Sequence, residues 1–345
     1  MKPLTVSSFL EKSAHMPLLD VRSPAEHQAG HIPGAMSFPL FSDEERVRVG
    51  TCYKQQGKDQ AVLLGLEIIG PRLSHMVQKA IEAAPDRQIA VHCWRGGMRS
   101  ESVAWMLEKA GFTCFLLQGG YKAYRNYVLE AFEKPMQVII VGGSTGSGKT
   151  AILEKLHDMG EQVLDLEGLA GHKGSSFGNM AGTEQPTTEQ FHSALFSRWD
   201  TFDPARPVWI EDESFSIGSV RLPYPLWEQM KPAPCLVPDM PRDFRILNLV
   251  DDYGDFPPGV LMQACERISR KLGAKRYQEV LDDLKAGKAE AVADNLLIYY
   301  DKTYKKGLER RPEVIRIPVD TRDPEANAKT LVQAWNEYKH LHKVL

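Results

Sequence analysis

The stretch that decides the fold is Val138-Ile139-Ile140-Val141-Gly142-Gly143-Ser144-Thr145-Gly146-Ser147-Gly148-Lys149-Thr150. Its first four residues are apolar and β-branched, which predicts a buried strand. The residues that follow match the pattern G-x4-G-K-[ST], whose backbone cradles a phosphate chain when it stands between a strand and a helix. A helix is predicted from Ala151 to Met159, so the motif has both the strand before it and the helix after it that phosphate binding requires. The predicted phosphate-binding residues are Gly143, Ser144, Thr145, Gly146, Ser147, Gly148, Lys149 and Thr150.

The chain around this loop alternates predicted strands and helices, which favours a parallel sheet covered by helices on both faces. The predicted strands are residues 163–166, 208–210, 245–250 and 314–319. The predicted helices are residues 189–199, 261–284, 285–300 and 324–339. We therefore expect a P-loop domain at residues 135–345. The loop recognises a polyphosphate, so the pattern leaves open whether the ligand is ATP.

Polar residues follow two of the predicted strands, at the edge where ligands of α/β sheets bind. Glu211, Asp212 and Glu213 are candidates for acid–base chemistry or for binding Mg²⁺, and a solvated acidic turn explains them equally well. A second segment contains glycines and polar side chains and is a candidate substrate loop; the alternative is a flexible connection. The candidate residues of this loop are His172, Lys173, Ser175 and Ser176.

A first α/β unit precedes the phosphate loop and ends near residue 134, where Glu133-Lys134-Pro135 reads as a linker. Strands are predicted at residues 17–21, 88–92 and 113–117, and helices at residues 100–110 and 121–132. We therefore expect a separate domain at residues 1–134. The length of 345 residues agrees with two domains, because single hydrophobic cores rarely grow so large.

The first unit contains a cysteine between a predicted strand and a predicted helix, in His92-Cys93-Trp94-Arg95-Gly96-Gly97-Met98-Arg99-Ser100. Loop N–H groups and the helix N-terminus favour negative charge above Cys93. Arg95 and Arg99 add positive charge, so we expect a reactive thiolate. The alternative is a buried structural cysteine.

Composition excludes several classes of protein. Hydrophobic residues make up 43% and charged residues 25% of the chain, as in ordinary globular proteins. Five cysteines, without a C-x-x-C pair, argue against a disulfide framework and a zinc site. The cysteines are therefore expected to be reduced thiols of a cytoplasmic protein. No apolar run approaches the roughly 20 residues that cross a bilayer, so we expect no membrane partner. The net charge of −3 requires any nucleic-acid binding to come from local patches.

Two local basic clusters are candidate RNA contacts. Basic side chains bind phosphates and aromatic rings stack on unpaired bases. The first cluster is expected on one helix, with four members spaced along one face: Arg267, Arg270, Lys271, Lys275 and Arg276. The second cluster combines Lys302, Lys305, Lys306, Arg310 and Arg311 with Tyr299, Tyr300 and Tyr304. A solvated charged face is the alternative for both.

Three motifs of the first unit resemble those of rhodanese domains: Leu18 to His27, Gly30 to Ala35 and Leu117 to Tyr121. The resemblance implies that Cys93 accepts sulfur or selenium and passes it on. Arg99 stands six residues after Cys93, whereas sulfur-transferring rhodaneses have this arginine at five. The longer loop resembles the C-x5-R cradle of dual-specificity phosphatases. A phosphatase is therefore one interpretation, and a loop enlarged for an oxyanion such as selenophosphate is another.

Taken together, the two domains resemble the bacterial tRNA 2-selenouridine synthases over essentially the whole chain. Further matching stretches are residues 41–46, 92–97, 164–170 and 174–178. The resemblance implies conversion of wobble 2-thiouridine to 2-selenouridine in the tRNA anticodon loop, with selenophosphate as selenium donor. It also implies an S-geranylated intermediate made from geranyl diphosphate, whose diphosphate suits the phosphate loop. We expect a selenophosphate-producing enzyme as partner and no tightly bound cofactor.

Three other functions are compatible with the motifs. A phosphatase–kinase fusion would form a phosphocysteine at Cys93 and use ATP at Lys149. An ATP-dependent tRNA sulfurtransferase would adenylate its substrate, although no second cysteine stands near Cys93 to resolve a persulfide. A non-catalytic RNA-binding or scaffold protein would need neither loop.

Overall fold

The structure is a computed structural model that describes residues 2–172, 184–254 and 256–342. The chain divides into two compact units. The first comprises Met1–Ala131 and His192–Ser197, and the second comprises Phe132–Phe191 and Arg198–Leu345. The chain thus leaves the first unit just before residue 134. Within the described residues, no helix is long and apolar enough to cross a membrane.

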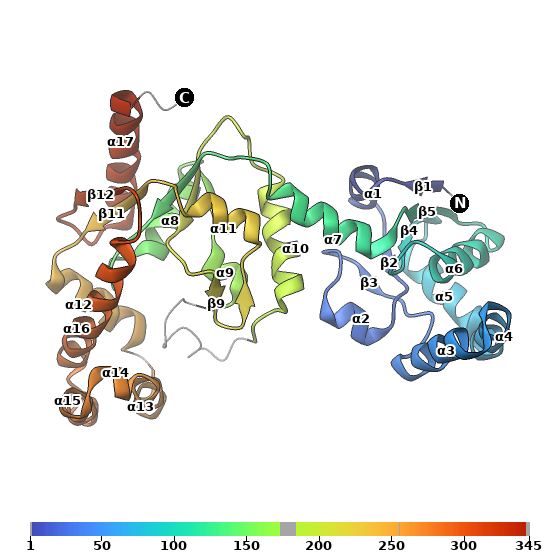
Figure 1. The fold of residues 1–345 in the computed structure, drawn as a ribbon, viewed down its shortest axis with the longest axis horizontal. Helices are drawn as coiled ribbons and strands as arrows, with labels where there is room; N and C mark the ends of the chain where they lie inside the picture. Colours follow the sequence, from blue (N-terminus) through green and yellow to red (C-terminus); the bar gives the residue numbers. More distant parts are fainter. Residues whose placement is uncertain (1, 173–183, 255, 343–345) are drawn as a thin grey trace. The chain divides into compact units, whose positions relative to one another are not determined.

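The first unit is built on a five-stranded parallel sheet (Figure 1). Its strand order is β1-β5-β4-β2-β3. The strands are β1 (Lys2–Leu4), β2 (Leu18–Asp20), β3 (Met36–Ser37), β4 (Gln88–His92) and β5 (Thr113–Leu117). β4 lies at the centre and is buried from its second residue onward, as its apolar sequence predicts. The predicted strands at residues 88–92 and 113–117 are confirmed.

Helices of the first unit pack against this sheet around a core that includes Leu19, Val91 and Leu107. They are α1 (Val6–Ser13), α2 (Pro24–Ala29), α3 (Asp43–Gln56), α4 (Lys58–Ile69), α5 (Leu73–Ala83), α6 (Met98–Lys109) and α7 (Gly120–Ala131), with the short 3₁₀ helix η1 (Gly70–Arg72). α3 begins with a capping box, in which Ser42 and Glu45 satisfy each other's backbone N–H groups.

The second unit contains another five-stranded parallel sheet, with the order β12-β11-β6-β8-β7. Its strands are β6 (Val138–Val141), β7 (Gln162–Leu164), β8 (Val208–Glu211), β11 (Cys235–Asp239) and β12 (Val314–Pro318); β9 (Ser216–Ile217) and β10 (Val220–Arg221) form a separate antiparallel pair. β6 lies at the centre of this sheet, with β11 on one side and β8 on the other. The phosphate loop therefore begins at the end of the central strand, which is the usual position of a ligand in such sheets.

Helices cover both faces of this second sheet (Figure 1). α8 (Lys149–Asp158) and α17 (Pro324–His342) share a core with Ile139 and Trp209, and α11 (Tyr224–Met230) contacts β6. The remaining helices are α9 (Leu166–Ala170), α10 (Thr188–Trp199), α12 (Arg242–Tyr253), α13 (Pro258–Arg267), α14 (Ser269–Leu272), α15 (Ala274–Lys285) and α16 (Ala289–Leu308). The predicted α/β class, with a parallel sheet covered by helices on both faces in the second unit, is confirmed.

One predicted strand of the second unit is wrong, and one predicted helix is divided. Residues 245–250 lie inside helix α12, and the strand of this region is β11, which contains Pro238. Residues 261–284 form three helices because the helical path breaks at Ile268 and at Gly273, whose φ is +82°. The basic residues 267–276 therefore do not share the face of one helix.

Candidate functional site

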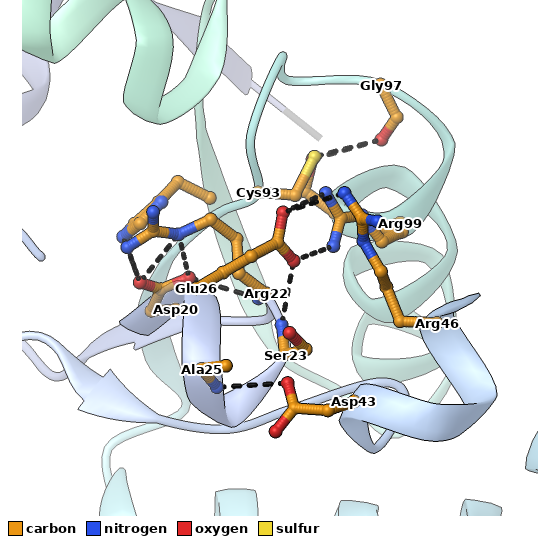
Figure 2. A network of polar contacts seen from close by, with 12 residues as sticks. Asp20, Arg22, Ser23, Ala25, Glu26, Asp43, Arg46, Cys93, Gly97 and Arg99 are labelled. Atoms are coloured by element: carbon orange, nitrogen blue, oxygen red, sulfur yellow. Dashed lines mark hydrogen bonds and ion pairs between the residues drawn. The ribbon is translucent and has the colours of Figure 1, made fainter. Parts of the chain in front are cut away.

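Cys93 follows the central strand β4, and α6 begins at Met98 after a short loop. The side chain is only 3% exposed. Ser100 Oγ donates a hydrogen bond to Cys93 Sγ at 3.2 Å. Figure 2 shows the contact of the thiol with the Gly97 carbonyl, at 3.8 Å. The sulfur thus lies at the N-terminal end of α6, where the helix dipole stabilises negative charge.

The cysteine loop is fixed by the start of α7. Tyr121 N–H donates to the Cys93 carbonyl at 2.8 Å, and Lys122 N–H donates to the Trp94 carbonyl at 3.0 Å. Gly120 has φ of +61°, and a Cβ there would lie 2.4 Å from both the Cys93 carbonyl oxygen and the Gly96 nitrogen. Only glycine fits at Gly120, because any side chain would push the two segments apart.

Arg99 is held by Glu26 of α2 (Figure 2). Arg99 Nη1 donates to Glu26 Oε2 at 2.6 Å and Nη2 to Oε1 at 3.3 Å, while Ser23 N–H donates to the same carboxylate at 3.0 Å. Burial raises the pKa of Glu26, but the bonds from Arg99 and Ser23 outweigh it and the pKa is lowered. The sequence does not identify Glu26 as the partner of Arg99, although Glu26 lies in the quoted opening motif. Arg95 is exposed on the loop.

Buried polar residues support the loop from the strand side. Arg22 pairs with Asp20 at 2.6 Å, and its guanidinium lies 3.7 Å from the ring centroid of Tyr121. Burial lowers the pKa of His92, the neighbour of Cys93, to about 4, so its imidazole is neutral near pH 7. The pairing of Arg22 compensates the cost of burying its charge.

The phosphate loop joins β6 to α8. Its N–H groups and the helix N-terminus form an anion-binding arrangement. Lys149 Nζ donates to the Gly143 carbonyl at 2.8 Å. Ser147 Oγ is buried and has no hydrogen-bond partner among the described residues, which leaves it available to a ligand. The Thr150 side chain is exposed.

Helices α12 and α16 hold the phosphate loop from outside. Arg245 Nε donates to the Thr145 carbonyl at 2.9 Å, and Asn248 Nδ2 donates to the Gly146 carbonyl at 2.9 Å. Tyr304 of α16 accepts the Gly143 N–H, and burial raises the pKa of this phenol. Tyr304, a predicted RNA contact, thus lies against the phosphate loop.

The three predicted carboxylates have different surroundings. Glu211 is buried and accepts the Glu167 N–H at 2.6 Å, and burial raises its pKa. Asp212 accepts from Arg311 Nε at 3.0 Å. Burial and the neighbouring Glu167 carboxylate raise the pKa of Glu213 to about 8. The described part of the chain contains no cluster of three His, Cys, Asp or Glu side chains that could hold a metal ion.

The candidate substrate loop is described only at its beginning. His172 N–H donates to the Glu167 carbonyl at 3.1 Å. Lys173, Ser175 and Ser176 lie outside the described residues.

The predicted basic cluster is spread over three helices. Arg267 ends α13, Arg270 and Lys271 lie in α14, and Lys275 and Arg276 lie in α15. All are exposed except Arg276, which is half-buried. Tyr300 of α16 packs against the apolar cluster formed by these helices.

Comparison with known proteins covers both units. Residues 5–127 match the family model of the rhodanese-like domain, and residues 136–256 match that of the tRNA 2-selenouridine synthase AAA domain. A tRNA 2-selenouridine synthase of Bdellovibrio bacteriovorus is 34% identical, over 90% of this chain and 93% of its own. That of Sulfurovum sp. is 35% identical over 91% and 94%, and that of Serratia proteamaculans is 36% identical over 77% and 71%. The chain belongs to the tRNA 2-selenouridine synthase family.

Proposed function

We propose that this protein converts 2-thiouridine at the wobble position of tRNA into 2-selenouridine, with selenophosphate as selenium donor. The observation that carries the proposal is that the chain is similar to such synthases across both units and has both loops complete. Cys93 and the phosphate loop each follow the central strand of a parallel sheet. The reaction would take place in the cytoplasm, on the anticodon loop.

The proposed reaction has two substitutions. In the first, the thiouridine sulfur attacks the allylic carbon of geranyl diphosphate; the new C–S bond forms, the C–O bond breaks and diphosphate leaves. In the second, selenium bonds to C2 of the base, the C2–S bond breaks and geranylthiol leaves with a proton. Water cleaves the selenium–phosphorus bond and releases phosphate. Alkylation assists because a thioether sulfur leaves more readily than a thiocarbonyl sulfur.

The residues divide between these steps. The Cys93 thiolate, beside Arg95 and Arg99, holds the selenium for the second substitution at the selenide level, without an S–Se bond, so that no oxidant is needed. The phosphate loop, with Lys149, binds the leaving diphosphate of the first. Positive charge and N–H donors there stabilise the charge that develops on the leaving group. Mg²⁺ bound to this diphosphate would face Thr150, and the reaction needs no tightly bound cofactor. Selenophosphate would come from a selenophosphate-producing enzyme.

Mass spectrometry of nucleosides tests the proposal. Thiolated tRNA is incubated with the protein, geranyl diphosphate and selenophosphate, and we expect S-geranylated nucleoside followed by 2-selenouridine. Cys93→Ala should accumulate the geranylated nucleoside without selenium, while the control Cys52→Ala, a thiol on α3, should behave as wild type. If wild-type protein left the thiouridine unchanged, the proposed function would be wrong. Selenium incorporation at the wild-type rate by Cys93→Ala would remove the carrier role.

A further inference from the structure

The second unit contains a cavity of about 210 Å³ between helices α12, α13, α15 and α16. Its walls are formed by aliphatic side chains that include Leu249, Leu261, Val292 and Leu296. A dry apolar cavity of about 150 Å³ is already large enough to bind benzene. This cavity therefore has room for an apolar group of several more carbon atoms.

Polar groups in the cavity wall are few. Of the described residues that line it, only Thr145, Tyr253, Cys265, Lys288 and Tyr300 have polar side-chain atoms. Lys288 is exposed, and Cys265 is a buried thiol without charge because burial raises its pKa to about 11. A nucleobase and a ribose would need several placed donors and acceptors, since unpaired polar groups are costly to bury. The wall suits a hydrocarbon chain instead.

The cavity adjoins the phosphate loop through shared residues. Thr145 belongs to the loop and also lines the cavity. Its carbonyl accepts from Arg245 of α12, and the next turns of this helix place Leu249 and Tyr253 in the cavity wall. The walls are thus hydrogen-bonded to the loop that would hold a diphosphate.

α16 connects the same two sites. Tyr300 lines the cavity, and Tyr304, one turn further on, accepts the Gly143 N–H of the phosphate loop. Asp301, between them, accepts from Arg245 Nη1 at 3.2 Å and so ties α16 to α12. Both helices therefore contact the phosphate loop and line the cavity, so the two sites are neighbours.

We propose that this cavity binds the hydrocarbon chain of a diphosphate ester whose diphosphate lies in the phosphate loop. The inference rests on the proposed function. It adds the position of the hydrocarbon chain and the residues that would distinguish this ligand from others. It also assigns the phosphate loop to a prenyl-type diphosphate rather than to a nucleotide. Burial of the chain supplies affinity that free diphosphate lacks.

Calorimetric binding tests the proposal with inorganic diphosphate, geranyl diphosphate and ATP as probes. We expect wild-type protein to bind geranyl diphosphate at least about tenfold more tightly than diphosphate, with a more negative heat-capacity change, because apolar surface is buried. ATP should gain nothing over diphosphate. Lys149→Ala should weaken the binding of both diphosphates.

A matched pair of variants tests where the hydrocarbon chain of the ligand binds. Ala289 is the exposed first residue of α16 and lines the cavity, so Ala289→Trp should fill the cavity and abolish the preference for geranyl diphosphate while leaving diphosphate affinity unchanged. Ala274 is the exposed first residue of α15 and lies outside the lining, so Ala274→Trp should retain the preference. Leu261→Asp, which puts a charge in the half-buried wall, should repeat the effect of Ala289→Trp.

Several results would overturn the inference. Equal wild-type affinity for diphosphate and geranyl diphosphate, or a preference that survives both Ala289→Trp and Leu261→Asp, would place the chain elsewhere. A preference for ATP that Ala289→Trp abolishes would assign the cavity to a nucleoside. Nucleoside analysis separates this from the proposed function: wild-type tRNA selenation with a failed cavity test leaves the function standing. If the preference for geranyl diphosphate depended on the cavity but the protein geranylated no tRNA, the cavity site would be supported and the proposed function would be wrong.

Discussion

Arg99 and Glu26, 73 residues apart in the chain, are joined by two hydrogen bonds of 2.6 and 3.3 Å beside the Cys93 loop. The carboxylate also accepts the Ser23 N–H, so its orientation is fixed by backbone as well as by side chain. Burial lowers the pKa of the Arg99 guanidinium, but the hydrogen bond and charge of Glu26 outweigh this effect and raise the pKa, with a smaller raising contribution from Cys93. Glu26 is therefore a positioning residue for the arginine of the cysteine loop.

The first prediction is that Glu26→Gln lowers the free energy of unfolding by about 1–2 kcal/mol at pH 7, because a partly buried charged pair is lost. The pKa of Glu26 is lowered from 4.5 in the folded protein, so its contribution is full above about pH 4.5 and is lost as the pH falls through the lowered pKa. Urea denaturation at several pH values measures this. The exposed Glu101→Gln should change little, and a Glu26→Gln deficit that persists in acid would contradict the ionic explanation.

A second prediction concerns the packing of the cysteine loop against α7. Gly120→Ala should lower the free energy of unfolding by more than Gly111→Ala and should also slow selenium transfer. Both glycines have positive φ, but nothing lies within 4 Å of a Cβ at Gly111, whereas the Cβ at Gly120 would meet the loop backbone. Gly111→Ala reports the backbone strain alone, about 1–2 kcal/mol. Denaturation curves of equal midpoint for the two variants would show that the loop adapts to the added carbon.

The sequence predicts the two loops well because each is a local motif whose function needs only a strand, a few glycines and a helix start. It does not predict Glu26 or Arg245 as their partners, nor Glu167 as the neighbour of Glu211 and Glu213, since these come from distant segments and no spacing rule connects them. Residues 245–250 illustrate the same limit. Their apolar run fits a buried strand or a helix, and tertiary contacts decide for α12, with Arg245 on the phosphate loop and Leu249 in the cavity wall.

A third prediction separates the two substitutions chemically. Lys149→Ala should prevent formation of the S-geranylated nucleoside, and supplying tRNA that is already geranylated should restore selenium incorporation. The control is Lys155→Ala, on the same helix α8, which removes a half-buried lysine paired with Asp158. Nucleoside mass spectrometry gives both readouts. If geranylated tRNA failed to bypass the defect while the variant remained folded and bound tRNA, the phosphate loop would serve the selenium step instead.

The fourth prediction follows from the raised pKa of Glu213, about 8, caused by burial and then by Glu167. The folded protein keeps this proton, whereas the unfolded chain releases it near 4.5, so the free energy of unfolding should fall as the pH rises from about 4.5 to about 8. Glu213→Gln cannot lose a proton and should show a smaller fall over this range. Denaturation of wild type, Glu213→Gln and the exposed control Glu309→Gln measures it. Parallel pH profiles for all three proteins would mean that Glu213 is ionised when folded.

The last prediction tests where tRNA binds. Arg270, Lys271 and Lys275 are exposed, although α14 and α15 divide them between two helices, so a shared helical face no longer supports the RNA assignment. If they still bind the phosphate backbone, replacing all three with Gln should weaken all tRNAs about equally. It should also reduce the salt slope by roughly 0.7 to 0.9 for each phosphate that the protein no longer neutralises.

The comparison is a triple Gln variant of Lys302, Lys305 and Lys306, the exposed lysines of the second cluster on α16. Both variants change the net charge by the same amount, so a general field effect would weaken binding equally in the two. A larger decrease of the salt slope in one variant identifies phosphate binding on its surface. Unchanged affinity and slope in the Arg270, Lys271 and Lys275 variant would show that this cluster is only solvated. Weaker binding by the α16 variant would then place the backbone beside Tyr304 and the phosphate loop, where a thiolated base could meet the geranyl donor.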